Sequence, residues 1–286
     1  MNFKSQCDAA GVRVRRSLAE TVAPMERSPE EPHSLPEAQS GANVALSTQD
    51  DDLGAQGCTR LSFVRHAQAL SNVDGVIRGE TTCGGLTEQG REQAGCLARR
   101  LELDQCDDPV TQVYSTPLAR AVETAEPVAQ ILGLRLQYLP QWRYANYGAA
   151  EGKTWREVYR DYPDIHPALH PDRPIAEGAE TMIAFRAATS AAITELTRRH
   201  PGEHILLFGS TENFMAAEEI LLDLPPDART RSKIAIDHTG IMTFDLVPAP
   251  WSPTGRRAVL VRHNDSSHLP LPQRRSRFRS TGPVGS

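Results

Sequence analysis

An arginine and a histidine stand side by side where a predicted strand ends. The run 61–64 (LSFV) suits a buried strand, and Arg65 and His66 follow it directly. A histidine that attacks phosphorus needs an oriented ring and strong phosphate ligands beside it. Arginine is such a ligand, because its planar guanidinium binds two phosphate oxygens at once and keeps its charge. The pair therefore indicates phosphate chemistry, although a single Arg-His dipeptide also fits a surface ion pair or a buried structural histidine.

Two further predicted strand ends carry groups that bind phosphate. The strand around 112–115 is followed by Arg120, and the strand 204–208 is followed by Ser210. Ligands of open α/β sheets bind beyond the carboxyl ends of the strands, so we expect both side chains to reach the Arg-His pair. Asn72 adds a neutral hydrogen-bond donor a few residues after that pair.

The elements that must position these side chains alternate between strand and helix. Strands are expected at 61–64, 112–115, 204–208, 241–246 and 258–261, and helices at 87–103, 117–133, 180–199 and 214–224. Pro127 predicts a kink or a break in the second helix. The alternation predicts an α/β fold, a three-layer α/β/α sandwich with a mostly parallel central sheet.

The two ends of the chain differ in composition from this central part. Residues 1–57 contain a stretch rich in Pro, Ser, Glu and Asp without periodicity, which predicts a disordered N-terminal tail. The C-terminal residues 271–286 carry four arginines and no acid, which predicts a basic flexible tail. The expected domain therefore comprises residues 58–270.

Composition excludes several classes of partner. The formal net charge of the 286 residues is -5, which implies no nucleic-acid partner. No apolar run approaches the ~18 residues of a membrane span, and the N-terminus has no apolar signal region. The five cysteines form no CxxC pair, so we expect free thiols, no metal site and a cytoplasmic protein. The oligomeric state stays open.

Several motifs in order resemble the histidine phosphatase superfamily, also called the phosphoglycerate mutase-like family. They are RHAQALSN from Arg65, LTEQGREQA from Leu86 and TPLARAVETA from Thr116, with looser matches at 147–152 (YGAAEG), 178–188 (GAETMIAFRAA) and 264–269 (NDSSHL). The resemblance extends over residues 60–269. It implies a phosphoglycerate mutase-like fold and transfer of a phosphoryl group through a phosphohistidine.

The resemblance also implies a role for each matched residue. His66 is the nucleophile, Arg65 and Arg120 hold the phosphate, and Asn72 assists. Water or another acceptor then takes the phosphoryl group, with no metal and no cofactor. These roles agree with the physics of phosphoryl transfer, which depends mostly on positioning and charge neutralisation.

The chain departs from the family pattern at two places. Ser210 stands where the family has a second histidine that donates to the phosphoryl oxygens, and a hydroxyl carries no positive charge. Losing one such donor typically costs ~10²–10³ in rate. Tyr144 stands where many members have a glutamate as the general acid, and tyrosine is a poor acid at neutral pH.

Other residues are candidates for the missing groups. Glu212 is the first candidate for the acid and Tyr144 the second, but an acidic residue near a helix start also stabilises that helix without any catalysis. His238 is a candidate ligand of the substrate, as are, less strongly, two histidines of the C-terminal motif, His263 and His268. Three more side chains are expected at the substrate mouth or, equally, in the core: Trp142, Arg143 and Tyr147.

The residues favour an enzyme, a metal-independent phosphatase that hydrolyses a small phosphorylated metabolite through phospho-His66. The alternative is a catalytically impaired member that binds a phosphate-bearing ligand or a protein partner. A mutase ranks below both, because nothing in the sequence indicates the control over water that a mutase needs. Substrate specificity is expected to lie in the insertion between Gly152 and Gly178.

Overall fold

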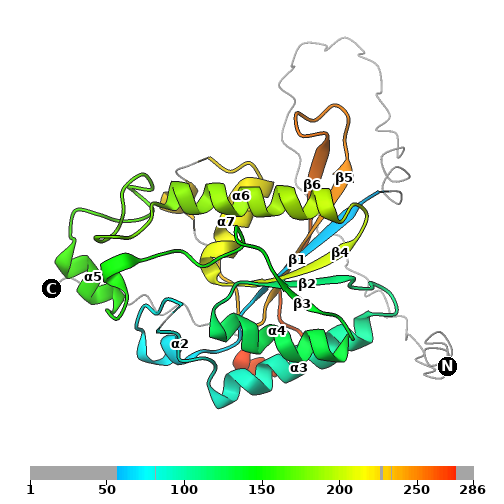
Figure 1. The fold of residues 1–286 in the computed structure, drawn as a ribbon, viewed down its shortest axis with the longest axis horizontal. Coiled ribbons are helices and arrows are strands. Elements are labelled where there is room, and N and C mark those ends of the chain that lie inside the picture. The colour runs from blue at the N-terminus through cyan, green and yellow to red at the C-terminus, as the bar shows by residue number, and fades with distance from the viewer. Residues whose placement is uncertain (1–56, 81, 226–227, 233, 275–286) are drawn as a thin grey trace, which may run out of the picture. The chain divides into compact units, whose positions relative to one another are not determined.

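The computed structural model describes residues 57–80, 82–225, 228–232 and 234–274 (Figure 1). Most of the two predicted tails, residues 1–56 and 275–286, lies outside the described residues. Residues 271–274 form a short 3-10 turn, η3 (Leu271–Gln273), whose Gln273 side chain accepts a hydrogen bond from Gln93 at 3.3 Å. The start of the segment predicted as a C-terminal tail therefore contacts the domain.

A six-stranded sheet forms the centre of the domain, in the order β3-β2-β4-β1-β5-β6. Its strands are β1 (Thr59–Arg65), β2 (Gln112–Ser115), β3 (Leu136–Tyr138), β4 (His204–Gly209), β5 (Ile241–Pro248) and β6 (Arg256–Asp265). The first four strands are mutually parallel, whereas β5 and β6 are antiparallel to their neighbours. This mostly parallel sheet confirms the predicted α/β class.

Helices cover both faces of the sheet (Figure 1). The helices are α2 (Leu70–Asp74), α3 (Glu88–Asp104), α4 (Ala119–Ile131), α5 (Trp155–Asp161), α6 (Met182–Arg199), α7 (Thr211–Leu221) and α8 (Ala228–Arg231). Apolar side chains of α3 and α4 pack with one face of the sheet, and those of α6 and α7 pack with the other. Because β-strand side chains alternate between faces, the same strands supply both cores.

Helix α4 continues through Pro127, so the predicted break is wrong. Proline removes one backbone hydrogen bond from a helix. The residues on either side of it, Ala125, Val128 and Ala129, are buried in the core between α4 and the sheet. This burial offsets the lost hydrogen bond. Among the described strands and α-helices, four short ones were not predicted, β3, α2, α5 and α8, because three to seven residues carry too little periodicity.

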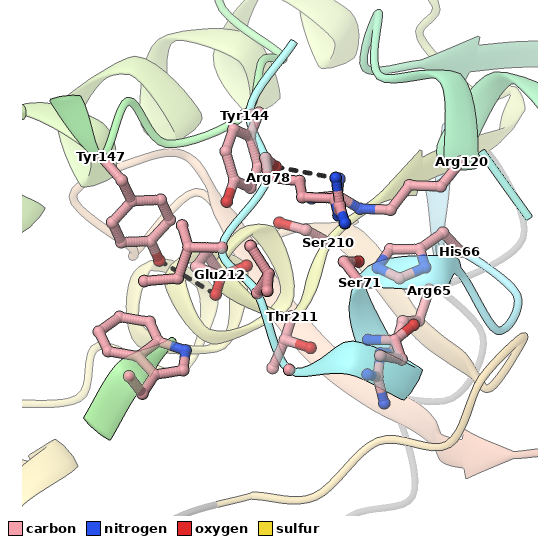
Figure 2. A pocket seen from close by; sticks show the side chains of 15 residues that line it. Arg65, His66, Ser71, Arg78, Arg120, Tyr144, Tyr147, Ser210, Thr211 and Glu212 are labelled. Carbon is pink, nitrogen blue, oxygen red and sulfur yellow. Dashed lines mark hydrogen bonds between the residues drawn. The ribbon is translucent and has the colours of Figure 1, made fainter. Parts of the chain in front are cut away.

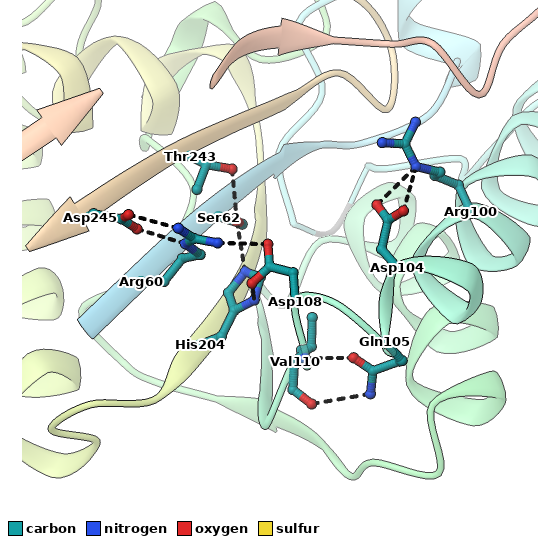
Figure 3. Close-up of polar contacts among 10 residues, drawn as sticks. All are labelled: Arg60, Ser62, Arg100, Asp104, Gln105, Asp108, Val110, His204, Thr243 and Asp245. Carbon is teal, nitrogen blue, oxygen red and sulfur yellow. Dashed lines mark hydrogen bonds and ion pairs between the residues drawn. The ribbon is translucent and has the colours of Figure 1, made fainter. Parts of the chain in front are cut away.

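A polar network lies at the beginning of β1 and β4, away from the strand ends that carry Arg65 and Ser210 (Figure 3). Arg60 contacts Asp245 through two nitrogens, at 2.6 and 2.7 Å, and pairs with Asp108 at 2.9 Å. His204 lies 3.0 Å from the same Asp108 carboxylate. Paired, partly buried charges of this kind hold neighbouring elements in place.

Trp142 belongs to the core, so its predicted alternative place at the substrate mouth is wrong. Its side chain is fully buried, packs against Phe63 at a ring-centroid distance of 5.7 Å, and donates from Nε1 to the Phe208 carbonyl at 2.8 Å. We expect Trp142→Ala to lower the free energy of unfolding by about 3–5 kcal/mol, through lost burial and the cavity left behind.

Denaturant unfolding of Trp142→Ala checks this prediction, with Trp251→Ala as the matched control. Trp251 is 65% exposed, so its removal is expected to change stability by no more than about 0.5 kcal/mol. Equal midpoints for the two variants would contradict the assignment of Trp142 to the core.

Two composition-based expectations have structural outcomes. Cys58, Cys83 and Cys96 carry free thiols, as predicted, but Cys106 does not, so the expectation fails for one of the described cysteines. Within the described ranges, no helix has both the length and the apolar character that crossing a bilayer requires.

Candidate active site

The strand end places His66 at the junction of β1 and β4. Its backbone N–H donates to the Gly209 carbonyl at 2.9 Å, and its side chain is 4% exposed. The ring nitrogen Nδ1 lies 2.7 Å from the Ala67 carbonyl oxygen. Because a carbonyl oxygen only accepts hydrogen bonds, Nδ1 carries the proton of the neutral ring. The lone pair on Nε2 is therefore available as a nucleophile.

The surroundings keep the His66 ring neutral. Burial lowers its pKa well below 6.5, and the positive charges of Arg120 and Arg65 lower it further. Both effects disfavour the protonated ring, because it is poorly solvated and repelled by its neighbours. A histidine in this state is a nucleophile at neutral pH without any general base.

The ring faces a cavity of ≈ 280 Å³ (Figure 2). The cavity lies beyond the carboxyl ends of β1 and β4, where ligands of parallel sheets bind. Its walls come from the strand ends, α2 and the loop after it, the Tyr144–Tyr147 loop, and the first turns of α4, α5 and α7. The lining residues include Arg65, His66, Ser71, Asn72, Arg78, Arg120, Tyr144, Tyr147, Trp155, Ser210, Thr211 and Glu212.

Two arginines meet at the bottom of this cavity, as the sequence predicts. Arg65 donates from Nη1 to the Ile236 carbonyl at 2.5 Å, and burial lowers its pKa to about 10, which keeps it charged at neutral pH. Arg120 is 4% exposed, donates to the Arg78 carbonyl at 3.2 Å, and lies over the Tyr144 ring at 4.9 Å. The Nε atoms of both are buried without a hydrogen-bond partner among the described residues.

Buried donors without partners are costly, and a bound anion removes that cost. Two such guanidinium groups beside a neutral histidine fit a phosphoryl group better than any other common ligand. No group of three or more His, Cys, Asp or Glu in the described part of the chain has the arrangement of a metal site.

Ser210 lies at the cavity wall, but its hydroxyl has another partner. It is the N-cap of α7, and both its backbone N–H and its Oγ donate to Asn213 Oδ1 at 2.9 Å. A serine hydroxyl has one proton, so this bond and a bond to a phosphoryl oxygen are mutually exclusive. Among the described residues that line the cavity, His66 is the only histidine.

The remaining predicted histidines lie elsewhere. His263 contacts the Glu218 carboxylate at 3.2 Å, and His268 contacts the Thr239 hydroxyl at 2.8 Å. His238 does not line the cavity either, although its ring centroid is 6.2 Å from that of His66. Its Nε2 lies instead 3.1 Å from Asn72 Oδ1.

Glu212 turns inward, as a catalytic role requires. It is the second residue of α7, lines the cavity, and accepts a hydrogen bond from the Tyr147 hydroxyl at 3.1 Å (Figure 2). Tyr144 also lines the cavity, with its ring centroid 5.5 Å from that of Tyr147, and burial raises its pKa above the usual value of a tyrosine. Tyr144 is therefore a neutral hydrogen-bond donor and a poor source of a proton.

A glycine motif positions the tyrosines of this wall. The Tyr-Gly-x-x-Glu-Gly segment forms a 3-10 turn, η2 (Gly148–Ala150), and Gly148 has a φ of 51°. A Cβ atom there would lie 2.3 Å from the Ala179 nitrogen of the 178–188 segment. The two motifs thus pack backbone against backbone, and they place Tyr147 against Glu212. Arg143 lies behind this wall, paired with Glu180 at 2.5 Å, and does not line the cavity.

Sequence reasoning missed several cavity residues that come from short elements. Arg78 follows α2 and supplies its carbonyl to Arg120, while its guanidinium pairs with Asp74 at 2.5 Å. Trp155 begins α5 inside the insertion that was expected to set specificity. Thr154 marks that helix start, because it and Glu157 form a capping box, a sequence signal that was available.

Comparison with known families agrees with this geometry. The family model of the histidine phosphatase superfamily (branch 1) matches residues 61–264. The chain belongs to this superfamily. Arg65 and His66 stand at the end of the first described strand of the matched region, and the observed α/β fold is the one expected for this superfamily.

Two curated proteins are similar to this chain at low sequence identity. It is 29% identical to phosphoglycerate mutase-like protein 4 of Arabidopsis thaliana over 149 residues, which are 50% of this chain and 63% of that protein. It is 24% identical to the probable phosphoglycerate mutase GpmB of Yersinia enterocolitica over 213 residues, which are 73% of this chain and 94% of that protein. The chain thus spans less than two thirds of the Arabidopsis protein and nearly all of the Yersinia protein.

Solved structures with the same fold include two phosphatases. One is a phosphoserine phosphatase mutant of Entamoeba histolytica in complex with phosphoserine, with a TM-score of 0.60, 22% identity, and coverage of 74% of this chain and 100% of that one. The other is a mycobacterial glucosyl-3-phosphoglycerate phosphatase, with a TM-score of 0.62, 22% identity, and coverage of 72% and 98%. At these identities the likeness establishes the fold.

Proposed function

We propose that this histidine phosphatase hydrolyses a small phosphomonoester through a phosphohistidine at residue 66. The observation that carries the proposal is the state of His66, a buried neutral ring with Nε2 free, beside two arginines whose Nε atoms are buried and have no partner among the described residues. This arrangement supplies a nucleophile and a charged site for the transferred group, which are the main requirements of phosphoryl transfer.

The reaction has two steps. His66 Nε2 attacks phosphorus, the bond between phosphorus and the ester oxygen breaks, and Glu212 gives a proton to the leaving oxygen. Water then attacks the phosphohistidine, Glu212 takes a proton from that water, and the bond between nitrogen and phosphorus breaks. The products are the alcohol and inorganic phosphate, and both side chains return to their starting states.

The remaining residues of the site stabilise charge. Arg65 and Arg120 neutralise the equatorial oxygens of the phosphoryl group, and Asn72 and neutral Tyr144 donate hydrogen bonds. The Ser210 hydroxyl contributes little while it donates to Asn213. The site therefore performs with arginines and neutral donors what a second histidine does in other members.

The cavity supports a small substrate. A volume of ≈ 280 Å³ lies near the lower end of the range for ligand sites, about 300–1,000 Å³. The names of similar structures include phosphoserine and glucosyl-3-phosphoglycerate phosphatases, both enzymes for small phosphate esters. The α5 segment with Trp155 is the part of the wall that we expect to contact the leaving group.

Two measurements on the full chain test the proposal. Phosphate release is measured on a panel of sugar, amino-alcohol and organic-acid phosphates, and the protein is quenched in base during turnover for mass spectrometry. We expect release on part of the panel and a phosphoryl group on the peptide that contains His66. Folded protein that neither releases phosphate nor becomes phosphorylated would contradict the proposal and favour a binding protein.

The pH profile tests the state of His66. Because the pKa of His66 is lowered well below 6.5, the nucleophile stays neutral as the pH falls through 6.5. We expect kcat/KM, calculated for the substrate dianion, to remain flat from pH 7.5 to below 6. The dianion correction is needed because a phosphate ester has its own pKa near 6. A decline centred at 6.5 would show an unperturbed histidine.

A further inference from the structure

The loop before β5 holds Arg65 from three directions. The Ile236 carbonyl accepts from the Arg65 guanidinium at 2.5 Å. The Gly240 carbonyl accepts from the Arg65 backbone N–H at 3.2 Å, and the Thr239 N–H donates to the Arg65 carbonyl at 3.1 Å. These contacts fix both the main chain and the side chain of Arg65, so the segment 236–240 acts as its support.

The C-terminal motif in turn holds this loop. Asn264 Oδ1 accepts from the Asp237 N–H at 2.7 Å, and Ser266 Oγ donates to Asp237 Oδ2 at 2.8 Å. His268 Nε2 lies 2.8 Å from the Thr239 hydroxyl. These residues of the C-terminal motif thus hold the segment 236–240, which in turn holds Arg65.

One residue of this loop, His238, contacts Asn72, the second residue that we expect to bind the phosphoryl group. His238 Nε2 lies 3.1 Å from Asn72 Oδ1, which also accepts the Ala69 N–H at 2.9 Å. A backbone N–H is always a donor, so the second contact identifies this amide atom as oxygen. His238 must then donate to it from Nε2. Asn72 Nδ2 has no partner among the described residues, so it can donate into the cavity.

We propose that His238 is a positioning residue, which fixes the amide plane of Asn72 so that Nδ2 donates to the phosphoryl group. This inference rests on the proposed phosphoryl-transfer function. The sequence predicted that His238 contacts the substrate directly. His238 does not line the cavity, so we assign it this indirect role instead.

The charge around His238 agrees with this role. Burial, together with the smaller effect of the nearby Arg65 charge, lowers its pKa to about 3, so the ring is neutral in the working range of pH. A neutral histidine has one N–H, and here Asn72 receives it. His238 therefore supplies no positive charge to replace the second histidine of the family and acts through the amide.

A double-mutant cycle separates the two roles of His238. The four proteins are the wild type, His238→Ala, Asn72→Ala and the double variant, and the readouts are calorimetric binding of orthovanadate, a phosphate analogue, and kcat/KM. We expect each single change to weaken both by about 10- to 100-fold, the value of one hydrogen bond to a charged group. The double variant is expected to match Asn72→Ala, since His238 acts only through that amide.

A loss in the double variant equal to the product of the two single losses would overturn the proposal, because it would show that His238 contacts the ligand independently of Asn72. His238→Gln retains an N–H donor and is expected to recover part of the loss, whereas His238→Phe retains a ring without a donor and is not. Equal behaviour of these two variants would indicate a purely structural role. His263→Ala is the matched control and is expected to leave both readouts unchanged, since His263 contacts Glu218 outside the cavity.

The binding readout keeps the two proposals distinguishable. Vanadate binding needs no turnover, so the cycle remains informative if the wild type binds vanadate and releases no phosphate. In that case the phosphatase proposal fails while the role of His238 is still decided by the cycle. A wild type that does not bind vanadate would overturn both.

Discussion

Replacing His66 with alanine is expected to lower kcat/KM by at least about 10⁴-fold, because removing the nucleophile of a covalent mechanism removes the pathway itself. Phosphate release under single-turnover and steady-state conditions measures the loss. The same variant is expected to show no phosphoryl group after a basic quench.

The loss must be separated from damage to the site. The His66 side chain is nearly fully buried, but its removal leaves Arg65, Arg120 and their hydrogen bonds in place. Orthovanadate binding to His66→Ala is therefore expected to persist, with reduced affinity. A variant that binds vanadate and still turns over within tenfold of the wild type would contradict the assignment of His66 as nucleophile.

Replacing Arg120 with methionine is expected to lower kcat/KM by about 10³-fold. An arginine that neutralises a transferring phosphoryl group is worth roughly 10³–10⁵ in rate, and Arg65 remains to supply part of that effect. Methionine keeps much of the apolar stem that packs near Tyr144, so the loss reports the missing charge and donors.

Lysine at position 120 and a surface arginine provide the controls. Arg120→Lys keeps the charge and loses the planar fork, so it is expected to recover only part of the activity. Arg198→Met removes an arginine that is 70% exposed and paired with Glu195, and it is expected to change nothing measurable. Arg120→Met with near wild-type activity would exclude Arg120 as a phosphate ligand.

Among the described residues that line the cavity, His66 is the only histidine, and this changes how we expect the site to work. Ser210 donates within the α7 cap, and His238 is neutral and directed to Asn72. In the part of the cavity that the structure describes, positive charge therefore comes from arginines alone, and those charges do not titrate near neutral pH. This predicts that no second imidazole contributes to the acid limb of the pH profile.

The local sequence determined the features that depend on neighbours along the chain. The strand 61–64 followed by Arg65 and His66 placed the proposed nucleophile, and the start of the helix after the strand 112–115 placed Arg120. Both follow from a rule of parallel sheets, that side chains just beyond the strand ends meet at one edge. Glu212 followed from the same rule, since α7 begins directly after β4.

Tertiary packing decided the position of side chains whose residue type fits more than one place in the fold. Trp142 and Tyr147 were equal candidates for the substrate mouth, and only packing put Trp142 in the core and Tyr147 against Glu212. An aromatic side chain is equally common in a protein core and at a binding site, so its type alone does not distinguish the two places. The short elements α2 and α5 were also decided by packing, because they are too short for a periodic signal.

The histidines show most clearly what the sequence alone does not determine. The sequence identified His66 by its motif and left His238, His263 and His268 as candidates of one kind. Their partners are Asn72, Glu218 and Thr239, which are separated from them by many residues in the chain. An imidazole takes its function from the atom opposite each ring nitrogen, so the motif indicated the proposed nucleophile, and only the folded chain decided which atoms the other three rings contact.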